Sequence, residues 1–412
     1  MRALKVVLGL FVLLVGGCGC GGGDGDDGDG GLGVPGRPAG YLVPELVSST
    51  LTFDTVEATG WHACGVASDG ATYCWGTNDN GQLGSIDNME LCTDVFRQNY
   101  SCTGTPHQVD TEQRFVALAG SLGQGVTCGL TAEGEAYCWG FGLWGQLGDD
   151  NQTSSVTPVA VSGGLQFESI RVSSDGAGAC GTTATGDLYC WGSLGLVLTT
   201  GYTNAAAFAP YRVEAAQGFI SFDLGQMHAC GVSASGQAYC WGNNWYGQLG
   251  LGSAGGDGGL SQTATPTAVV GGHVFRSIVT SSNQTCALTD TGEAYCWGVG
   301  HNIGSTFNTT GYVSTPQPVS GGHSYVELYA GLSQTCGLTA AGDAYCWGEN
   351  YLGELGDGTQ EIRTTPVKVQ TTQKFVSLSH RPTCGLTAQG QAYCWGDNGS
   401  GQVGKPPYYE NH

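Results

Sequence analysis

The strongest constraint on this chain is a short segment that occurs seven times. In each copy two cysteines are separated by nine residues, and the second cysteine lies within Tyr-Cys-Trp-Gly. The copies occupy residues 64–76, 128–140, 180–192, 230–242, 286–298, 336–348 and 384–396. The spacing inside a copy never varies, whereas successive copies begin 48 to 64 residues apart. A fixed unit joined by connections of variable length predicts a repeat architecture.

The second copy indicates why the cysteine spacing is constant. Gly134, at the third position of the loop, is typical of a three-residue hairpin turn between two antiparallel strands. That turn places Cys128 opposite Cys138 in a non-hydrogen-bonded pair, where Cα atoms lie about 4.5 Å apart, within disulfide reach. We therefore predict one cross-strand disulfide per repeat. The predicted pairs are Cys64–Cys74, Cys128–Cys138, Cys180–Cys190, Cys230–Cys240, Cys286–Cys296, Cys336–Cys346 and Cys384–Cys394.

The same register assigns the other side chains to two faces of the hairpin. Tyr137 and Trp139 lie on one face, and Ala136 and Cys138 lie on the other. Gly129, opposite Tyr137, leaves room for the tyrosine ring. Each hairpin should therefore have one bulky aromatic face and one small face. Sheets of this kind can stack large face against small face around a ring.

Two further strands precede the hairpin in each repeat. One has the pattern Thr-Pro-Val-x-Val, as at 157–161, and its proline is typical of an edge strand. The other begins with an aromatic residue, as in Phe-Glu-Ser-Ile at 167–170. Four short strands in each of seven repeats predict an all-β chain. We expect residues 41–412 to form a seven-bladed β-propeller with four-stranded blades.

The segment after each hairpin carries a family resemblance. It reads Trp-Gly-Thr-Asn-Asp-Asn-Gly-Gln-Leu-Gly at 75–84 and Trp-Gly-Asp-Asn-Gly-Ser-Gly-Gln-Val-Gly at 395–404. Together with the hairpin, it resembles the regulator of chromosome condensation repeat, whose family forms seven-bladed propellers. The resemblance implies that an N-terminal strand around Pro44 completes the last blade and closes the ring.

The resemblance implies two different functions, and a fold alone does not choose between them. The eukaryotic namesake of the family is a nuclear guanine-nucleotide exchange factor for a small GTPase. Secreted bacterial relatives include a protein inhibitor of β-lactamases, which binds its enzyme through one face of the propeller. The leader and the cysteines of this chain fit the second precedent better.

The first 40 residues predict export. Two basic residues precede an apolar run at 6–15 that is too short to span a bilayer, and small residues precede Cys18. Residues 1–17 resemble a bacterial lipoprotein signal, which implies a lipid on Cys18, followed by a disordered Gly/Asp tether through residue 40. The expected location is the cell envelope, outside the cytoplasm, at the outer membrane or the cell surface. The alternative is an ordinary signal peptide, with Cys18 and Cys20 in disulfides.

Composition and charge narrow the classes of function. A net charge of −21 repels the phosphates of nucleic acids. The 18 cysteines indicate an oxidising compartment, because their spacing does not fit zinc ligands. His62 and His228 occupy equivalent positions in two repeats, and we expect a structural role for them. Because no nucleophile elbow, metalloprotease motif or phosphate loop occurs, we predict no enzymatic activity, cofactor, metal or nucleic-acid partner.

Recognition is expected where the repeat is interrupted. Residues 85–104 form an insert with its own pair, Cys92 and Cys102, and the glycine-rich connection at 251–264 is expected to be mobile. Unpatterned aromatic residues before the Gly-Gln-Leu-Gly element are hot-spot candidates. They are Trp144, Trp245, Tyr246 and Tyr351.

We interpret the chain as a monomeric protein-binding or scaffold module with an unidentified protein partner. One alternative is a carbohydrate-binding propeller that takes a surface glycan, which would require aromatic pockets that recur from blade to blade. A second is an enzyme, which would require a converging polar cluster at the central channel. A third, by family analogy, is a guanine-nucleotide exchange factor. The candidate aromatic residues also have a purely structural interpretation, in which they pack over neighbouring blades.

Overall fold

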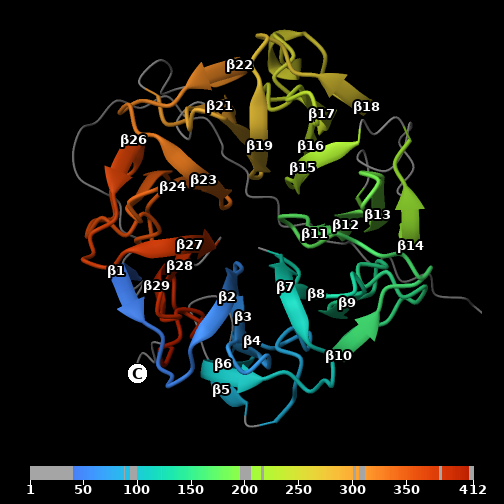
Figure 1. Cartoon of the computed structure of the whole chain (residues 1–412), viewed down its shortest axis with the longest axis vertical. Helices are drawn as coiled ribbons and strands as arrows, with labels where there is room; N and C mark the ends of the chain where they lie inside the picture. The colour runs from blue at the N-terminus through green and yellow to red at the C-terminus, as the bar shows by residue number, and fades with distance from the viewer. Residues whose placement is uncertain are drawn as a thin grey trace, which may run out of the picture. The chain divides into compact units, whose positions relative to one another are not determined.

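Seven antiparallel sheets surround a central channel in the described part of the chain (Figure 1). The computed structural model describes residues 40–87, 89–92, 100–121, 123–194, 206–214, 218–299, 303–305, 311–379 and 383–407. Within these residues no helix is long and apolar enough to cross a membrane. The predictions for the leader, including lipidation of Cys18, fall outside the described residues.

The strands of each blade have the same order from the channel outward. The inner strands are β2 (Phe53–Ala58), β7 (Phe115–Gly120), β11 (Ser169–Val172), β15 (Phe219–Leu224), β19 (Phe275–Thr280), β23 (Tyr325–Ala330) and β27 (Phe375–Ser379). The second strands, which carry the first cysteine of each copy, are β3 (His62–Ala67), β8 (Val126–Thr131), β12 (Gly178–Thr182), β16 (His228–Ser233), β20 (Gln284–Thr289), β24 (Gln334–Thr339) and β28 (Thr383–Thr387).

The Tyr-Cys-Trp-Gly segments and the proline-containing segments form the outer half of each blade. The third strands are β4 (Thr72–Thr77), β9 (Ala136–Gly140), β13 (Leu188–Gly192), β17 (Ala238–Asn243), β21 (Ala294–Val299), β25 (Ala344–Gly348) and β29 (Ala392–Gly396). The outer strands are β6 (Tyr100–Gln108), β10 (Ser155–Ala160), β14 (Ala207–Arg212), β18 (Gln262–Ala268), β22 (Tyr312–Pro318), β26 (Arg363–Lys368) and β1 (Tyr41–Leu46). The first blade has a fifth strand, β5 (Glu90–Cys92), which pairs with β6.

The blade is offset by one strand from the repeat in the sequence. Each proline-containing strand pairs with the hairpin that precedes it in the chain, so that Val159 of β10 lies opposite Cys138 of β9. At the N-terminus, β1 has no preceding hairpin and pairs instead with β29, where Glu45 lies opposite Cys394. The predicted closure of the ring by an N-terminal strand is therefore confirmed.

The predicted cross-strand disulfides are also confirmed. Cys128 and Cys138 are direct register partners, with their Cα atoms 4.0 Å apart. In the seven hairpins the Cα–Cα distance stays between 4.0 and 4.1 Å. The cysteine register inferred from the turn of the second copy is therefore found in all seven copies.

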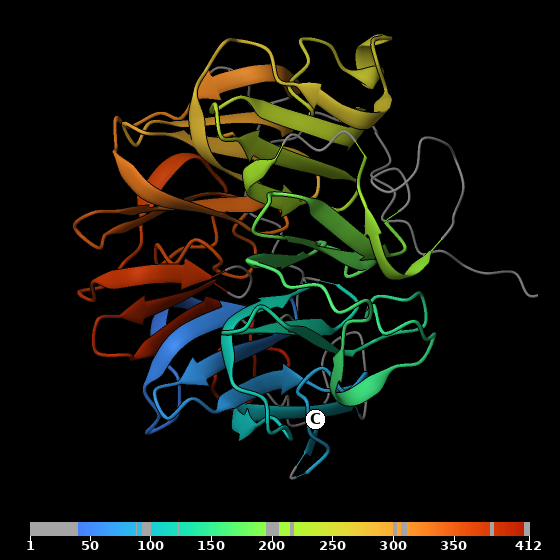
Figure 2. The same cartoon turned by 45° about the vertical axis from the view of Figure 1, so that its right-hand side comes forward.

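Neighbouring blades stack large face against small face, as predicted. Cys64 and Cys74 of the first blade pack against Phe115 and Trp139 of the second, and this arrangement recurs around the ring. Figure 2 shows the sheets following one another face to face around the ring. The seven tryptophans of the third strands are fully buried. Each blade therefore contributes one disulfide and one indole to the core, on opposite faces of its sheet.

One detail of the predicted packing is wrong. Gly129 does lie opposite Tyr137, but the ring above the glycine is that of Phe115 on the inner strand. A Cβ atom on Gly129 would lie 2.6 Å from Cδ1 of Phe115. The hairpin register could not reveal this contact, because the phenylalanine comes from the strand next to the hairpin.

Candidate functional site

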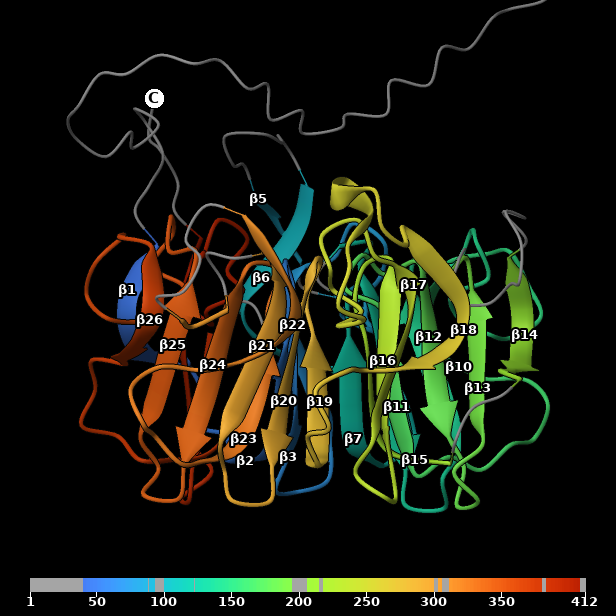
Figure 3. The same ribbon diagram turned by 90° about the horizontal axis from the view of Figure 1, so that it is seen from above.

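The longer connections of the propeller leave on one side, which we call the loop face. It is formed by residues 78–87, 141–154, 244–261 and 349–362, each of which leads from a third strand to the next strand, and by residues 397–407, which follow the third strand β29. Figure 3 shows β5 and the connection between β17 and β18 projecting from this side, opposite the short hairpin turns. Variation in length and sequence between repeats is therefore concentrated on one face.

The Asn-x-x-Gly-Gln-Leu-Gly element on this face has a structural role. Asn78 closes the loop, since its Oδ1 accepts from the Leu83 N–H at 2.9 Å and its Nδ2 donates to the Ser85 carbonyl at 2.7 Å. The Gln82 carbonyl accepts a hydrogen bond from the indole N–H of Trp139, in the next blade, at 2.9 Å. The equivalent bonds join Trp191 to Gln146, Trp297 to Gln248, Trp395 to Glu354 and Trp75 to Gln402.

The same element fixes the backbone of the residue two positions before its glutamine. The amide N–H of Trp144 donates to Gln146 Oε1 at 2.8 Å, and that of Tyr246 donates to Gln248 Oε1 at 2.9 Å. The side chains at and beside these positions are free to differ between blades, because the contacts use the backbone. The loop element that accepts a hydrogen bond from the next blade therefore also positions side chains of variable identity at the surface.

The structure places all four candidate aromatic residues on the loop face with large exposed fractions. Trp144 is 45% exposed, Trp245 51%, Tyr246 38% and Tyr351 55%. They lie in three different blades and do not form one cluster. Trp144 has an edge-to-face contact with Phe141, with ring centroids 5.3 Å apart. Each candidate therefore has its own local surroundings.

On the loop face of the fourth blade, one candidate residue contacts an aromatic side chain of the next blade. Tyr246 contacts Tyr312 of the fifth blade edge to face, with ring centroids 6.4 Å apart, and the Tyr312 hydroxyl donates to the carboxylate of Asp257. Sequence reasoning missed Tyr312 and Asp257, since one lies in an outer strand and the other in the glycine-rich connection. That connection contains the short 3-10 turn η2 (Gly255–Asp257).

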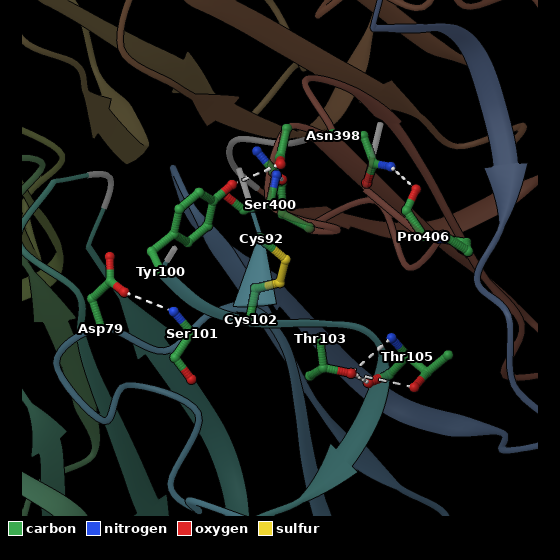
Figure 4. Close-up of a disulfide and its surroundings, with 12 residues drawn as sticks. Asp79, Cys92, Tyr100, Ser101, Cys102, Thr103, Thr105, Asn398, Ser400 and Pro406 are labelled. Atoms are coloured by element: carbon green, nitrogen blue, oxygen red, sulfur yellow. Dashed lines mark hydrogen bonds between the residues drawn. A yellow bond between two sulfur atoms is a disulfide. The ribbon is translucent and has the colours of Figure 1, made fainter. Parts of the chain in front are cut away.

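The insert is attached to two blades. β5 pairs with β6, and Cys92 and Cys102 form a buried disulfide beneath it (Figure 4). The Tyr100 hydroxyl donates to the Gly399 carbonyl of the seventh blade at 2.8 Å, and it lies 3.1 Å from Ser400 Oγ. The base of the insert therefore belongs to the rigid scaffold.

A groove of about 390 Å³ lies beside the insert on the loop face. Ile86 and Met89 of the insert form one side, and Val156 of the second blade's outer strand forms the other. The loop face is thus hollowed next to the insert.

The two repeat histidines have the structural role predicted for them. The His62 ring is fully buried, with Nδ1 2.8 Å from Thr59 Oγ1 and Nε2 2.7 Å from Thr127 Oγ1. His228 is equally buried, and its Nε2 lies 3.0 Å from Thr285 Oγ1. Burial lowers the pKa of His62 to about 3 and that of His228 to about 4, so both rings are neutral at physiological pH.

The central channel contains a small cavity of about 30 Å³ with charged side chains from several blades. Arg171 Nε lies 4.0 Å from Asp223 Oδ1, and Asp223 Oδ2 accepts the Thr280 amide N–H at 2.7 Å. These charges are engaged with one another and with the backbone. Among the described residues, no group of three or more His, Cys, Asp or Glu side chains is arranged to hold a metal ion.

Seven blades, joined by the indole-to-loop hydrogen bond at five boundaries and closed by an N-terminal strand, define a disulfide-stapled β-propeller. Models of the regulator of chromosome condensation (RCC1) repeat match residues 133–180, 235–288 and 341–380 in one form and 53–82, 219–248 and 377–402 in another. The chain belongs to the RCC1 repeat family.

Curated relatives are similar over part of the chain. Human E3 ubiquitin-protein ligase HERC2 is 30% identical over 156 residues, which is 37% of this chain and 3% of HERC2. Human RCC1 domain-containing protein 1 is 32% identical over 149 residues, which is 29% of this chain and 39% of the relative. The chain thus spans well under two thirds of the length of these relatives.

Solved structures show the same fold at low sequence identity. Human WBSCR16 is 17% identical, with a TM-score of 0.69 over 86% of this chain and 89% of that structure. Prp20p from Saccharomyces cerevisiae is 18% identical, with a TM-score of 0.66 over 83% of this chain and 82% of that structure. These likenesses establish the propeller fold.

Proposed function

We propose that this protein is a lipid-anchored propeller of the cell envelope that binds a protein partner through its loop face. The observation that carries the proposal is the way the Gly-Gln-Leu-Gly loops hold large aromatic side chains in water. Trp144, Trp245, Tyr246 and Tyr351 are exposed, while the backbone around them is fixed by hydrogen bonds. Pre-ordered aromatic residues are common centres of binding energy at protein interfaces, because little conformational entropy is lost on binding.

The cysteines and the leader support the location. Cross-strand disulfides in every blade are typical of proteins that fold in oxidising compartments. The leader sequence supports export and a lipid on Cys18. A single acyl chain binds membranes only marginally, so we propose that the mature N-terminus carries more than one chain.

Related propellers support a protein as the partner. The Prp20p structure is described together with binding to Gsp1p and histones, and a second structure has Kap60 bound to yeast RCC1. Gsp1p, histones and Kap60 are partners of the yeast protein, and we do not assign them to this chain. What we carry over is the class of ligand, a protein, and the use of a propeller as the binding surface.

The test of the binding face is affinity capture from envelope extracts with the full, anchored chain. The triple variant Trp144→Ala, Trp245→Ala, Tyr351→Ala should lose the captured partner, because it removes three of the four exposed rings, one from each of the three blades, and changes only side chains. Ile220→Ala is the matched control, since Ile220 is equally exposed but lies on an inner strand. Capture that survives the triple variant, or fails with the unmodified chain, refutes the proposed face.

The test of the anchor is separate. Cys18→Ala should abolish incorporation of a labelled fatty acid and release the protein from the membrane fraction. Cys20→Ala, two residues away, should leave both unchanged. Labelling that persists in Cys18→Ala would show that the lipid, if present, is attached elsewhere.

A further inference from the structure

The loop face of the fourth blade carries a compact group of three aromatic rings and one carboxylate. We call it the blade-4 patch, and it consists of Trp245, Tyr246, Asp257 and Tyr312. Tyr246 and Tyr312 meet edge to face across the boundary between the fourth and fifth blades. The Tyr312 hydroxyl donates to Asp257, which places the carboxylate at the edge of the aromatic group.

The blade-4 patch is ordered by contacts within the propeller. The amide N–H of Trp245 donates to Asn243 Oδ1 at 2.9 Å, and the Trp245 carbonyl accepts the Gly256 N–H at 3.0 Å. The indole lies against the backbone of η2, since a Cβ on Gly255 would be 3.2 Å from Trp245 Cε3. The rings are thus presented in place before any ligand arrives, which lowers the entropic cost of binding.

Permanently cationic side chains are scarce in this part of the chain. Between residues 115 and 275 the only lysine or arginine residues are Arg171 and Arg212. Arg171 lines the central channel beside Asp223, and Arg212 pairs with Asp187 at a hairpin turn, on the side away from the loop face. Neither arginine therefore lies beside the exposed carboxylate of Asp257, and among the described residues of the fourth blade's loop face this carboxylate favours a cation.

We propose that the blade-4 patch receives an arginine or lysine side chain of the protein partner. The cation would lie against the faces of the aromatic rings, whose quadrupoles attract it, and its N–H groups would reach the carboxylate of Asp257. The inference rests on the proposed function, because it assigns a partner chemistry to part of the same loop face. It implies that the partner carries a basic segment that is complementary to an acidic propeller.

The test uses purified protein and short fluorescein-labelled peptides, with affinity read from fluorescence anisotropy. The probe is Gly-Arg-Gly-Arg-Gly, and its matched control contains citrulline, which keeps the shape of arginine without the charge. We expect binding of the arginine peptide alone. Trp245→Ala should weaken it by about three- to fivefold, the loss of one exposed cation–π contact. Asp257→Asn should weaken it by about two- to fivefold, the loss of one exposed ion pair.

Asp150→Asn is the matched control for Asp257→Asn. Asp150 is an exposed carboxylate of the loop face in the second blade, and asparagine tolerates its positive φ of 66°. The inference is overturned if the citrulline peptide binds as well as the arginine peptide, or if Asp150→Asn weakens binding as much as Asp257→Asn. Such results with intact partner capture would leave the proposed function standing, because capture measures the whole loop face.

Discussion

Acid should destabilise this propeller through its two buried histidines. The rings of His62 and His228 contact threonine hydroxyls, and no carboxylate of the described residues is among their hydrogen-bond partners. Burial lowers the pKa of His62 from 6.5 to about 3 and that of His228 from 6.5 to about 4. Below pH 6.5 the unfolded chain binds protons that the folded chain does not, so the free energy of unfolding falls as the pH falls.

The size of the effect follows from the pKa values. Each pH unit between the unfolded and folded pKa costs about 1.4 kcal/mol per histidine. At pH 4.5, two units below the unfolded value, each ring should contribute a loss of roughly 2 to 3 kcal/mol, or about 5 kcal/mol for the pair. The loss is absent above about pH 7.5, where both states hold neutral rings.

Glutamine is the natural substitution for this test. Gln284 and Gln334 occupy the equivalent position in the fifth and sixth blades and are buried there. The double variant His62→Gln, His228→Gln should therefore fold and lose most of the acid-dependent difference. His107→Gln on β6 is the control, because His107 is only half-buried whereas His62 and His228 are fully buried.

The assay is denaturant unfolding at pH 7.5 and 4.5 with the disulfides intact, followed by tryptophan fluorescence. The unmodified chain should lose more stability between the two pH values than the double variant does. If the two proteins lose the same amount, the buried histidines are not the cause and the reasoning fails.

Three further predictions concern the scaffold. Replacing Cys128 and Cys138 by alanine should lower the free energy of unfolding by roughly 3 kcal/mol, the chain-entropy value for an 11-residue loop, and an unchanged denaturation midpoint would contradict it. Gly129→Ala should cost about 1 to 3 kcal/mol by overpacking against Phe115, and Phe115→Leu in the same chain should recover part of that loss if the contact is responsible. Deleting residues 41–46 should sharply lower the melting temperature in calorimetry, because it removes the strand that closes the ring, and an unaltered melting curve would exclude that role.

The fold could be predicted closely because its signals are local and repeated. The disulfide register needs only a three-residue turn and two cysteines nine residues apart, and Cys128 lies opposite Cys138 as that turn requires. Ring closure followed from the family resemblance and is realised by β1 against β29. The contact between Gly129 and Phe115 was not predictable from the hairpin, because it depends on the neighbouring inner strand.

The candidate site could be predicted only in part. Trp144, Trp245, Tyr246 and Tyr351 interrupt a regular pattern, so the sequence alone singles them out. Tyr312 and Asp257 interrupt no pattern, and they lie 55 residues apart in the chain. They meet because the outer strand of one blade lies beside the loop of the blade before it.

The sequence by itself determined the number of blades, the hairpin register and the alternation of large and small faces, since turn length and side-chain period act over a few residues. Only the tertiary structure decided which loop lies beside which strand, how the blades are offset from the repeats, and that Trp245, Tyr246, Tyr312 and Asp257 gather in one patch. Those contacts cross from one blade to the next. They depend on how the sheets stack around the ring, which no single repeat encodes.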